Sequence, residues 1–125
     1  MKTSLEYTSV FNVRQFGAVA DGQTLDSESI QSALDACAER GGGTVYLPAG
    51  KYVTGSLFLH DNTTIYLDAG ATILGSEDPA DYPVIHSRWE GKHQETYAPL
   101  IGGVNLQNIA ISGRGTIDGR GAMWW

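Results

Sequence analysis

The sequence has few cationic residues and no long apolar run. The first scarcity argues against a nucleic-acid partner and the second against a membrane-spanning segment. Eight lysines and arginines stand against fourteen aspartates and glutamates, which gives a formal net charge of −6. Because no cluster of basic side chains is available to neutralise phosphates, the composition argues against nucleic acid as a partner. No stretch of about 18 apolar residues occurs, so no membrane-spanning segment and no membrane partner are expected.

Cysteine is also scarce, since Cys37 is the only one in the chain and an internal disulfide is therefore excluded. Its place in an apolar helical pattern predicts a buried thiol, with a reactive or metal-binding role as the alternative. The opening MKTSLEYTSVFNVRQ lacks the apolar run of a signal peptide, so a cytoplasmic protein is expected.

Short apolar runs closed by turn residues are abundant. TVYLPAG at 44–50 returns as TIYLDAG at 64–70, twenty positions further on. Repetition at this spacing is typical of an array of stacked units. A coiled sheet that lays each strand parallel on the previous turn accommodates both the repeat and the short connections. Three pairs should stack, two inside the coil and one outside: Val45 on Ile65, Leu47 on Leu67, and Tyr46 on Tyr66.

The alternation of apolar and polar residues predicts a first strand over Phe11–Arg14 and a turn at Asp21-Gly22. Seven further short strands are expected: Thr44–Leu47, Lys51–Val53, Ser56–Leu59, Thr64–Leu67, Thr72–Leu74, Asn108–Ser112 and Thr116–Asp118.

One amphipathic helix is predicted over residues 27–40, with its start capped by the side chain of Asp26 or Ser27. Its apolar residues fall on one face, at Ile30, Ala33, Leu34, Cys37 and Ala38. Because the helix precedes the first repeat, we expect it to cover the open end of the apolar core.

The chain is expected to form a single segment over residues 1–125. Its parts are an initial strand and capping helix over 11–43, the first turns of the coil over 44–75, an inserted loop over 76–99, and further turns over 100–125. A long loop in such an array is usually functional or an ordered flap.

Three stretches resemble the N-terminal part of glycoside hydrolase family 28, the polygalacturonases and their relatives: FNVRQFGAVADGQTLDSESIQSALDACAERGGGTVYLPAGKY, GSLFLHDNTTIYLDAGATILGS and NIAISGRGTIDGRGAMWW. The resemblance implies a mainly β fold, a right-handed parallel β-helix of the pectate-lyase-like superfamily. It implies inverting hydrolysis of α-linked galacturonic acid chains, a pectic oligo- or polysaccharide as partner, and no cofactor or metal.

The family's catalytic aspartates are implied to lie in an Asn-Thr-Asp motif and an Asp-Asp pair, followed by Gly-His-Asp and Arg-Ile-Lys motifs. None of the four motifs occurs in this sequence, so no catalytic residue is assigned. We therefore expect a fragment of a pectin-degrading hydrolase that is inactive alone. A non-catalytic β-helix, of the carbohydrate-binding or tail-fibre type, is the alternative, and a calcium-dependent pectate lyase relative ranks last.

Candidate site residues are few. Asp68 and Asp118 are the best candidates for an acid–base pair on position alone, but both follow apolar strands and precede glycine-containing corners, where an aspartate usually holds a turn. Within the inserted loop, Arg88 could pair with a galacturonate carboxylate and Trp89 could stack on a sugar face. These two are the substrate-binding candidates, with anchoring of the loop as the alternative.

Four other polar residues of the loop are weaker candidates for a functional role. Glu90 and Glu95 are expected to be solvated rather than to act as an acid and a base. His86 and His93 match no recognised metal-ligand spacing.

The last turn of the coil is expected to lack a cap, because no second amphipathic helix follows it. Self-association through this C-terminal end, or binding there to the remainder of a longer chain, is the resulting hypothesis. The apolar residues of that region are Ile109, Ile111, Ile117, Met123, Trp124 and Trp125.

Overall fold

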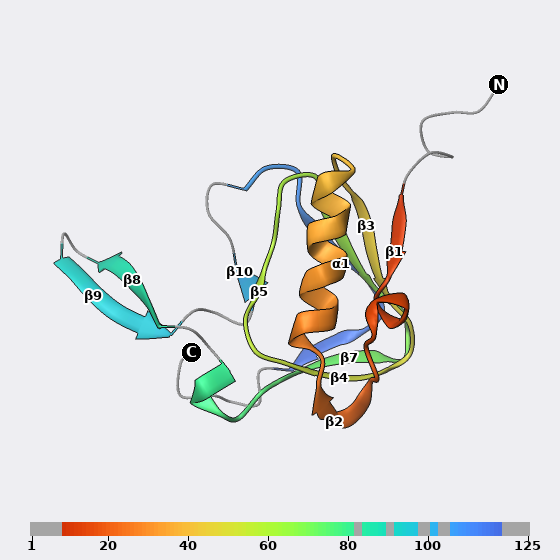
Figure 1. Cartoon of the computed structure of the whole chain (residues 1–125), viewed down its shortest axis with the longest axis horizontal. Helices are drawn as coiled ribbons and strands as arrows, with labels where there is room; N and C mark the ends of the chain where they lie inside the picture. Colours follow the sequence, from red (N-terminus) through yellow and green to blue (C-terminus); the bar gives the residue numbers. More distant parts are fainter. Residues whose placement is uncertain (1–8, 82–83, 90–91, 98–100, 103–105, 119–125) are drawn as a thin grey trace.

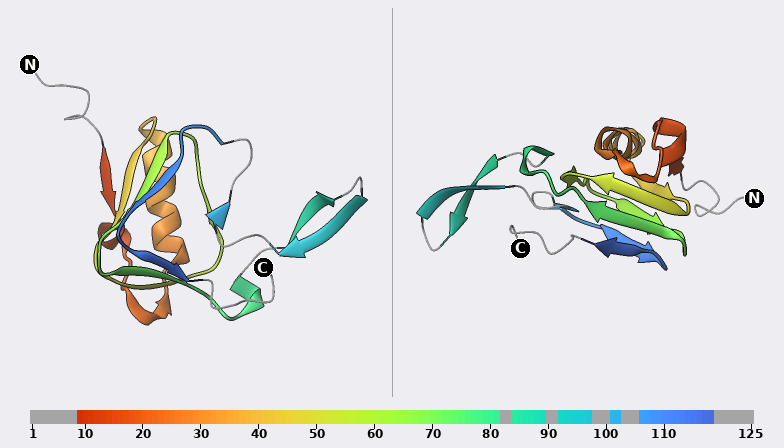
Figure 2. Two further views of the ribbon diagram at one scale, coloured as in Figure 1. Left: turned by 180° about the vertical axis from the view of Figure 1, so that it is seen from behind. Right: turned by 90° about the horizontal axis from the view of Figure 1, so that it is seen from below.

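Parallel strands stack in successive turns, and one helix lies across an end of the stack (Figures 1 and 2). The structure is a computed structural model that describes residues 9–81, 84–89, 92–97, 101–102 and 106–118. Over 84–89 and 92–97 the description concerns the backbone. Among the described residues, none of the helices combines the length and the apolar character needed to span a membrane.

In the described parts of the chain, three parallel sheets form the faces of the coil. The first has the order β1-β3-β6-β11, with β1 at Val10–Asn12, β3 at Gly43–Leu47, β6 at Thr63–Leu67 and β11 at Ala110–Gly113. The second has the order β12-β7-β4-β2, with β2 at Asp21–Leu25, β4 at Gly50–Thr54, β7 at Ala71–Gly75 and β12 at Thr116–Asp118. The third pairs β5 (Leu57–Phe58) with β10 (Ile101–Gly102).

The expected register between repeats is confirmed. In the pairing of β3 with β6, Val45 lies opposite Ile65, Leu47 opposite Leu67, and Tyr46 opposite Tyr66. The four aliphatic residues are buried, whereas the two tyrosine rings stack on the outside with centroids 5.9 Å apart. Inward and outward positions therefore form columns along the stack, as the twenty-residue repeat predicts.

Apart from β12, the predicted strands differ from the observed ones by one or two residues at their ends, and two of these differences have a local cause. The first strand ends at Asn12, because the Asn12 side chain accepts a hydrogen bond from the Arg14 N–H and starts a 3₁₀ helix, η2, at Val13–Phe16. The strand expected from Asn108 begins at Ala110, since Asn108 has a φ of 56°, a left-handed turn conformation.

The Asp21-Gly22 turn lies within a strand, because β2 spans it. The Asp21 carboxylate accepts hydrogen bonds from the N–H groups of Gln23 and Thr24, which makes a tight local bend. The register between β2 and β4 shifts over the same residues, so the strand and the turn coexist as an irregularity at the sheet edge.

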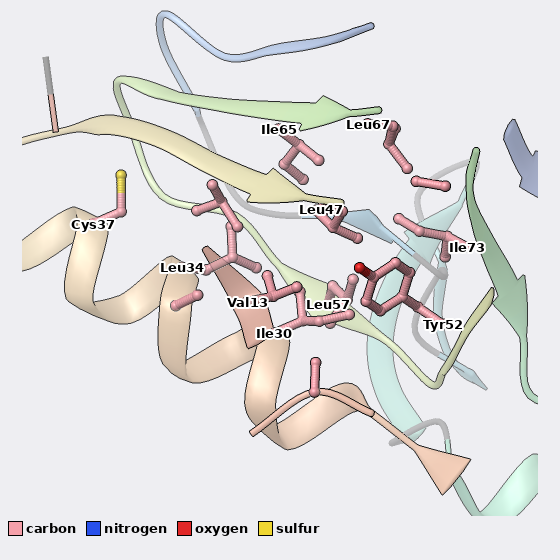
Figure 3. Packing of buried hydrophobic residues seen from close by; sticks show 14 of the residues in the cluster. Val13, Ile30, Leu34, Cys37, Leu47, Tyr52, Leu57, Ile65, Leu67 and Ile73 are labelled. Carbon is pink, nitrogen blue, oxygen red and sulfur yellow. The ribbon is translucent and has the colours of Figure 1, made fainter. Parts of the chain in front are cut away.

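The helix α1 spans Ser27–Glu39 and lies across the first turns of the coil, where the sequence places it (Figure 2). Ile30, Ala33, Leu34 and Cys37 are buried, and they join the cluster formed by the inward-facing strand residues (Figure 3). The buried thiol expected at Cys37 is confirmed, and burial raises its pKa.

The expected side-chain cap at the start of α1 is wrong. Asp26 stands at the N-cap position, and its carbonyl accepts from the Ile30 N–H at 3.0 Å, but its side chain makes no hydrogen bond to the helix. Its carboxylate accepts instead from the Val19 and Ala20 N–H groups, at 3.0 and 2.9 Å. Ser27 also bonds elsewhere, since its hydroxyl oxygen accepts from the Gly55 N–H at 2.6 Å. Both side chains therefore accept hydrogen bonds from backbone N–H groups outside the helix and do not cap it.

Residues 76–99, expected as a loop, contain regular structure. A short 3₁₀ helix, η3, at Pro79–Asp81 leads into an antiparallel hairpin of β8 (Val84–Trp89) and β9 (Lys92–Tyr97). The hairpin projects away from the coil (Figures 1 and 2). The charged and polar residues of both strands concealed the pattern, because neither strand alternates cleanly between apolar and polar side chains.

Candidate functional site

The hairpin lies beside one face of the coil. The hairpin is inserted in the sequence between β7 and β10. The next strand after the hairpin is therefore β10, which pairs with β5. Figure 1 shows the hairpin extending from the side of the molecule on which β5 and β10 lie. The β5–β10 sheet and the hairpin therefore lie on the same side of the molecule (Figure 1).

Arg88 and Trp89, the predicted substrate-binding residues, lie at the end of β8 next to its turn. In the hairpin register Arg88 lies opposite His93 and Trp89 opposite Lys92, whereas the base of the hairpin is the pair Val84 and Tyr97. Both candidates are therefore carried at the far end of the hairpin. Their side chains lie outside the described parts, so their contact with a substrate stays a prediction.

Several other candidates also lie outside the description. These are Glu90, Met123, Trp124 and Trp125, together with the side chains of His86, His93 and Glu95.

The segment that precedes the hairpin is anchored to the corner between β4 and β5. The Ser76 N–H donates to the Thr54 carbonyl at 2.7 Å, and the Ser76 hydroxyl donates to the Asp81 carboxylate. Asp81 also packs closely on Gly55, because a Cβ atom there would lie 1.9 Å from the Asp81 carbonyl oxygen. Gly55 is therefore required for the segment before the hairpin to sit against the coil. The sequence showed this glycine as one among sixteen, with no signal that singled it out.

A pocket of about 300 Å³ opens next to β5, at the helix-covered end of the coil. It is lined by Leu25, Ser27, Glu28, Gln31, Ser56 and Phe58. The Gln31 side-chain amide donates to the Phe58 carbonyl and accepts from the Phe58 N–H, both at 2.9 Å. Gln31 thus pairs with β5 as a neighbouring strand would, and it holds the backbone of one pocket wall in place.

The same glutamine belongs to a polar chain on the surface. Its amide also donates to Asp35 at 3.0 Å, and Asp35 lies 2.7 Å from the His60 ring nitrogen Nε2. The His60 hydrogen bond holds the pKa of Asp35 below its ordinary value. Both partners are largely exposed, so the chain ties α1 to the turn after β5 rather than forming a shielded catalytic pair.

Asp68 holds a turn, as the sequence predicts. Its carboxylate accepts from the Tyr46 hydroxyl at 2.8 Å and from the Ala69 N–H at 2.9 Å, and the tyrosine hydrogen bond lowers the pKa of Asp68. Asp118 is exposed at the end of β12 and belongs to a different sheet. Asp68 thus lies in the corner between β6 and β7, whereas Asp118 ends the strand β12.

Inverting glycoside hydrolysis requires an acid and a base about 6.5–9.5 Å apart, with room for a water molecule between them. Asp26, Asp35 and Asp68 are each committed to hydrogen bonds that join segments of this fold. What the described residues offer is a sheet face, a projecting hairpin and a pocket.

The family model described as rhamnogalacturonase A/epimerase, pectate lyase-like, matches residues 10–78, more than half of the chain. The chain belongs to this family. The family match covers α1, the pocket residues and the repeated strands, and it ends before the hairpin.

Individual relatives narrow the comparison. A probable polygalacturonase of Vitis vinifera is 36% identical over 98% of this chain, which covers 28% of that protein. The structure of a family 28 exopolygalacturonase from Yersinia enterocolitica is 41% identical, with a TM-score of 0.83, over 90% of this chain and 21% of that one. The expected resemblance to glycoside hydrolase family 28 and the expected right-handed parallel β-helix fold are confirmed. The chain spans 28% of the length of the first of these relatives and 21% of the second.

A third relative has a different character. Plasmin and fibronectin-binding protein A of Streptococcus pneumoniae is 37% identical over 98% of this chain, which covers 17% of that protein. The fold of this family is therefore shared by enzymes and by at least one protein named for binding other proteins.

Proposed function

We propose that this chain forms the first turns of a pectin-degrading glycoside hydrolase that cleaves α-linked galacturonosyl chains with inversion. The carrying observation is the likeness to the family 28 exopolygalacturonase, which extends over 90% of the chain at 41% identity. In this proposal the chain binds pectic saccharide but does not cleave it alone, because the aspartate motifs implied by the resemblance do not occur in its sequence.

The proposed contribution of the chain is to hold the substrate. A galacturonate carboxylate needs a cation in a defined place, and a guanidinium can bind it through two parallel hydrogen bonds. An indole ring can cover the apolar face of a sugar. Arg88 and Trp89 would supply these groups at the far end of the hairpin, which extends from the side of the molecule that carries β5 and β10 (Figure 1).

Electrophoresis of the chain through gels that contain polygalacturonate tests this role. We expect the polysaccharide to retard the chain, and the double variant Arg88→Ala, Trp89→Ala to lose most of the retardation. Lys51→Ala is the matched control, because it removes one exposed positive charge from β4, away from the hairpin. An unretarded chain, or an equal loss in the Lys51 variant, would contradict the proposal.

A non-catalytic binding module is the second candidate, favoured by the similarity to the streptococcal plasmin- and fibronectin-binding protein. Immobilised fibronectin and plasmin distinguish the two. Capture of the chain on either protein, with no retardation by polygalacturonate, would favour the binding module over the hydrolase.

A further inference from the structure

The pocket beside β5 has the size and the lining of a site for one sugar ring. Its volume of about 300 Å³ lies at the lower end of the range for small-molecule sites. Two apolar side chains border it, Leu25 with 47% and Phe58 with 40% of its surface exposed. Large apolar side chains left open beside a cavity are available to cover the apolar face of a ligand ring.

The walls of the pocket are held in place before any ligand arrives. Gln31 fixes the Phe58 backbone through two hydrogen bonds of 2.9 Å. Ser27 is fixed in the same way, because its hydroxyl oxygen accepts from the Gly55 N–H at 2.6 Å. A site with fixed walls loses little conformational entropy on binding, which favours a weakly interacting ligand such as a sugar.

The charge of the pocket selects among sugars. Of the six described residues that line it, Glu28 is the one that carries a charge, and none is a cation. A sugar hydroxyl can donate to this carboxylate, whereas the carboxylate of a galacturonate unit would be repelled by it. The pocket therefore suits an uncharged unit better than an acidic one.

The position of the pocket connects it to the β5–β10 face. Phe58 lies in β5, opposite Gly102 of β10, and α1 closes the stack beyond it. A saccharide that crosses β10 and then β5 along the direction of stacking would reach the pocket at the end of the face. The pocket is thus placed to receive a terminal or distal unit of an extended chain.

We propose that this pocket is a saccharide subsite that takes one uncharged hexopyranose unit, which in pectin is a methyl-esterified galacturonosyl unit. The pectic identity of the unit rests on the proposed function, whereas the preference for an uncharged sugar rests on Phe58 and Glu28. The subsite would make the protein favour esterified over unesterified pectin at this end of the face.

Calorimetric titration of the 125-residue chain with three probes tests the subsite. The probes are α-1,4-linked trigalacturonate, its methyl ester and the neutral trisaccharide maltotriose. We expect the ester to bind about three- to tenfold more tightly than the acid, the range that corresponds to one modest interaction. Phe58→Ala should weaken binding of the ester by a similar factor. Phe58 is exposed, so its removal leaves the core intact.

Two matched controls accompany these variants. Tyr66→Ala removes an aromatic ring of almost equal exposure, 39%, from a different sheet, and it should leave binding unchanged. Glu28→Gln should reduce the preference for the ester, whereas Glu39→Gln makes the same change of charge at the other end of α1 and should not. Equal effects of the Phe58 and Tyr66 variants, or a preference for the acid that Glu28→Gln does not alter, would overturn the subsite.

The probes also separate this proposal from the proposed function. Binding of maltotriose that Phe58→Ala weakens, with no binding of either galacturonide, would support the pocket and contradict the pectic hydrolase. Binding of the galacturonides that depends on Arg88 and Trp89 but is unchanged in Phe58→Ala would support the hydrolase and overturn the pocket.

Discussion

The carboxylate of Asp26 should be among the most stabilising polar groups in the chain. Asp26 is 1% exposed, and its two oxygens accept the N–H groups of Val19 and Ala20 at 3.0 and 2.9 Å. Hydrogen bonds to a charged group contribute about 1.5–3 kcal/mol each. Because water can reach the partly exposed Val19 when the carboxylate is removed, we expect Asp26→Ala to cost about 2–4 kcal/mol rather than the full sum.

Thermal unfolding followed by circular dichroism measures this cost. For a chain of this size a loss of 2–4 kcal/mol corresponds to a fall in Tm of about 8–16 °C. Asp21→Ala is the control, because Asp21 also accepts from two backbone N–H groups, of Gln23 and Thr24, but does so in an exposed turn. Water can replace those bonds, so the control should shift Tm far less.

Two results would refute this reasoning. Equal falls in Tm for the two variants would mean that burial does not strengthen the Asp26 bonds. An unchanged Tm in Asp26→Ala would mean that the segment around Val19 does not depend on the carboxylate at all.

Three further outcomes are expected. Leu34→Asp should lower the free energy of unfolding by about 3–5 kcal/mol, because it places an unpaired charge in the contact between α1 and the coil; an unchanged melting temperature would contradict the capping role. Tyr46→Phe should raise the pKa of Asp68 toward its ordinary value in an NMR titration, and a pKa that stays low would show that the tyrosine hydroxyl is not the cause. The exposed Ile111 and Ile117, at 47% and 39%, should make the chain self-associate at micromolar concentration. Changing both to Ser should reduce this in sedimentation experiments, and a monomeric unaltered chain would contradict it.

The stacking of the coil could be predicted from the sequence because the repeat encodes it locally. Val45 and Ile65 occupy the same place in two copies of one pattern, so the register follows from the spacing once the strands are taken as parallel. The apolar face of α1 could be predicted for a similar reason, since its period is a property of consecutive residues.

The features that sequence reasoning missed depend on partners distant in the chain. Asp26 and Ser27 are residue types that usually cap a helix. In the structure Asp26 accepts from the Val19 N–H and Ser27 accepts from the Gly55 N–H instead. No local pattern reports such competition. The hairpin was missed because its strands are stabilised mainly by each other, so they lack the apolar alternation of a half-buried strand.

The pocket belongs to the same class of feature. Leu25 comes from β2 and Phe58 from β5, and the two strands belong to different sheets that the folded coil brings to one pocket. Their exposure gives no signal in the sequence, where both residues look like ordinary members of an apolar pattern.

We infer that this chain binds pectic saccharide without an acid–base pair of its own, and a reducing-end assay on polygalacturonate measures whether it does. The purified chain should release no reducing ends above the buffer rate, because the loss of acid–base catalysis alone removes about 10²–10⁴-fold of the rate. The same samples should show retardation of the chain by the polysaccharide. Release of reducing ends that scales with the amount of protein, and that disappears in Asp118→Asn, would contradict the claim.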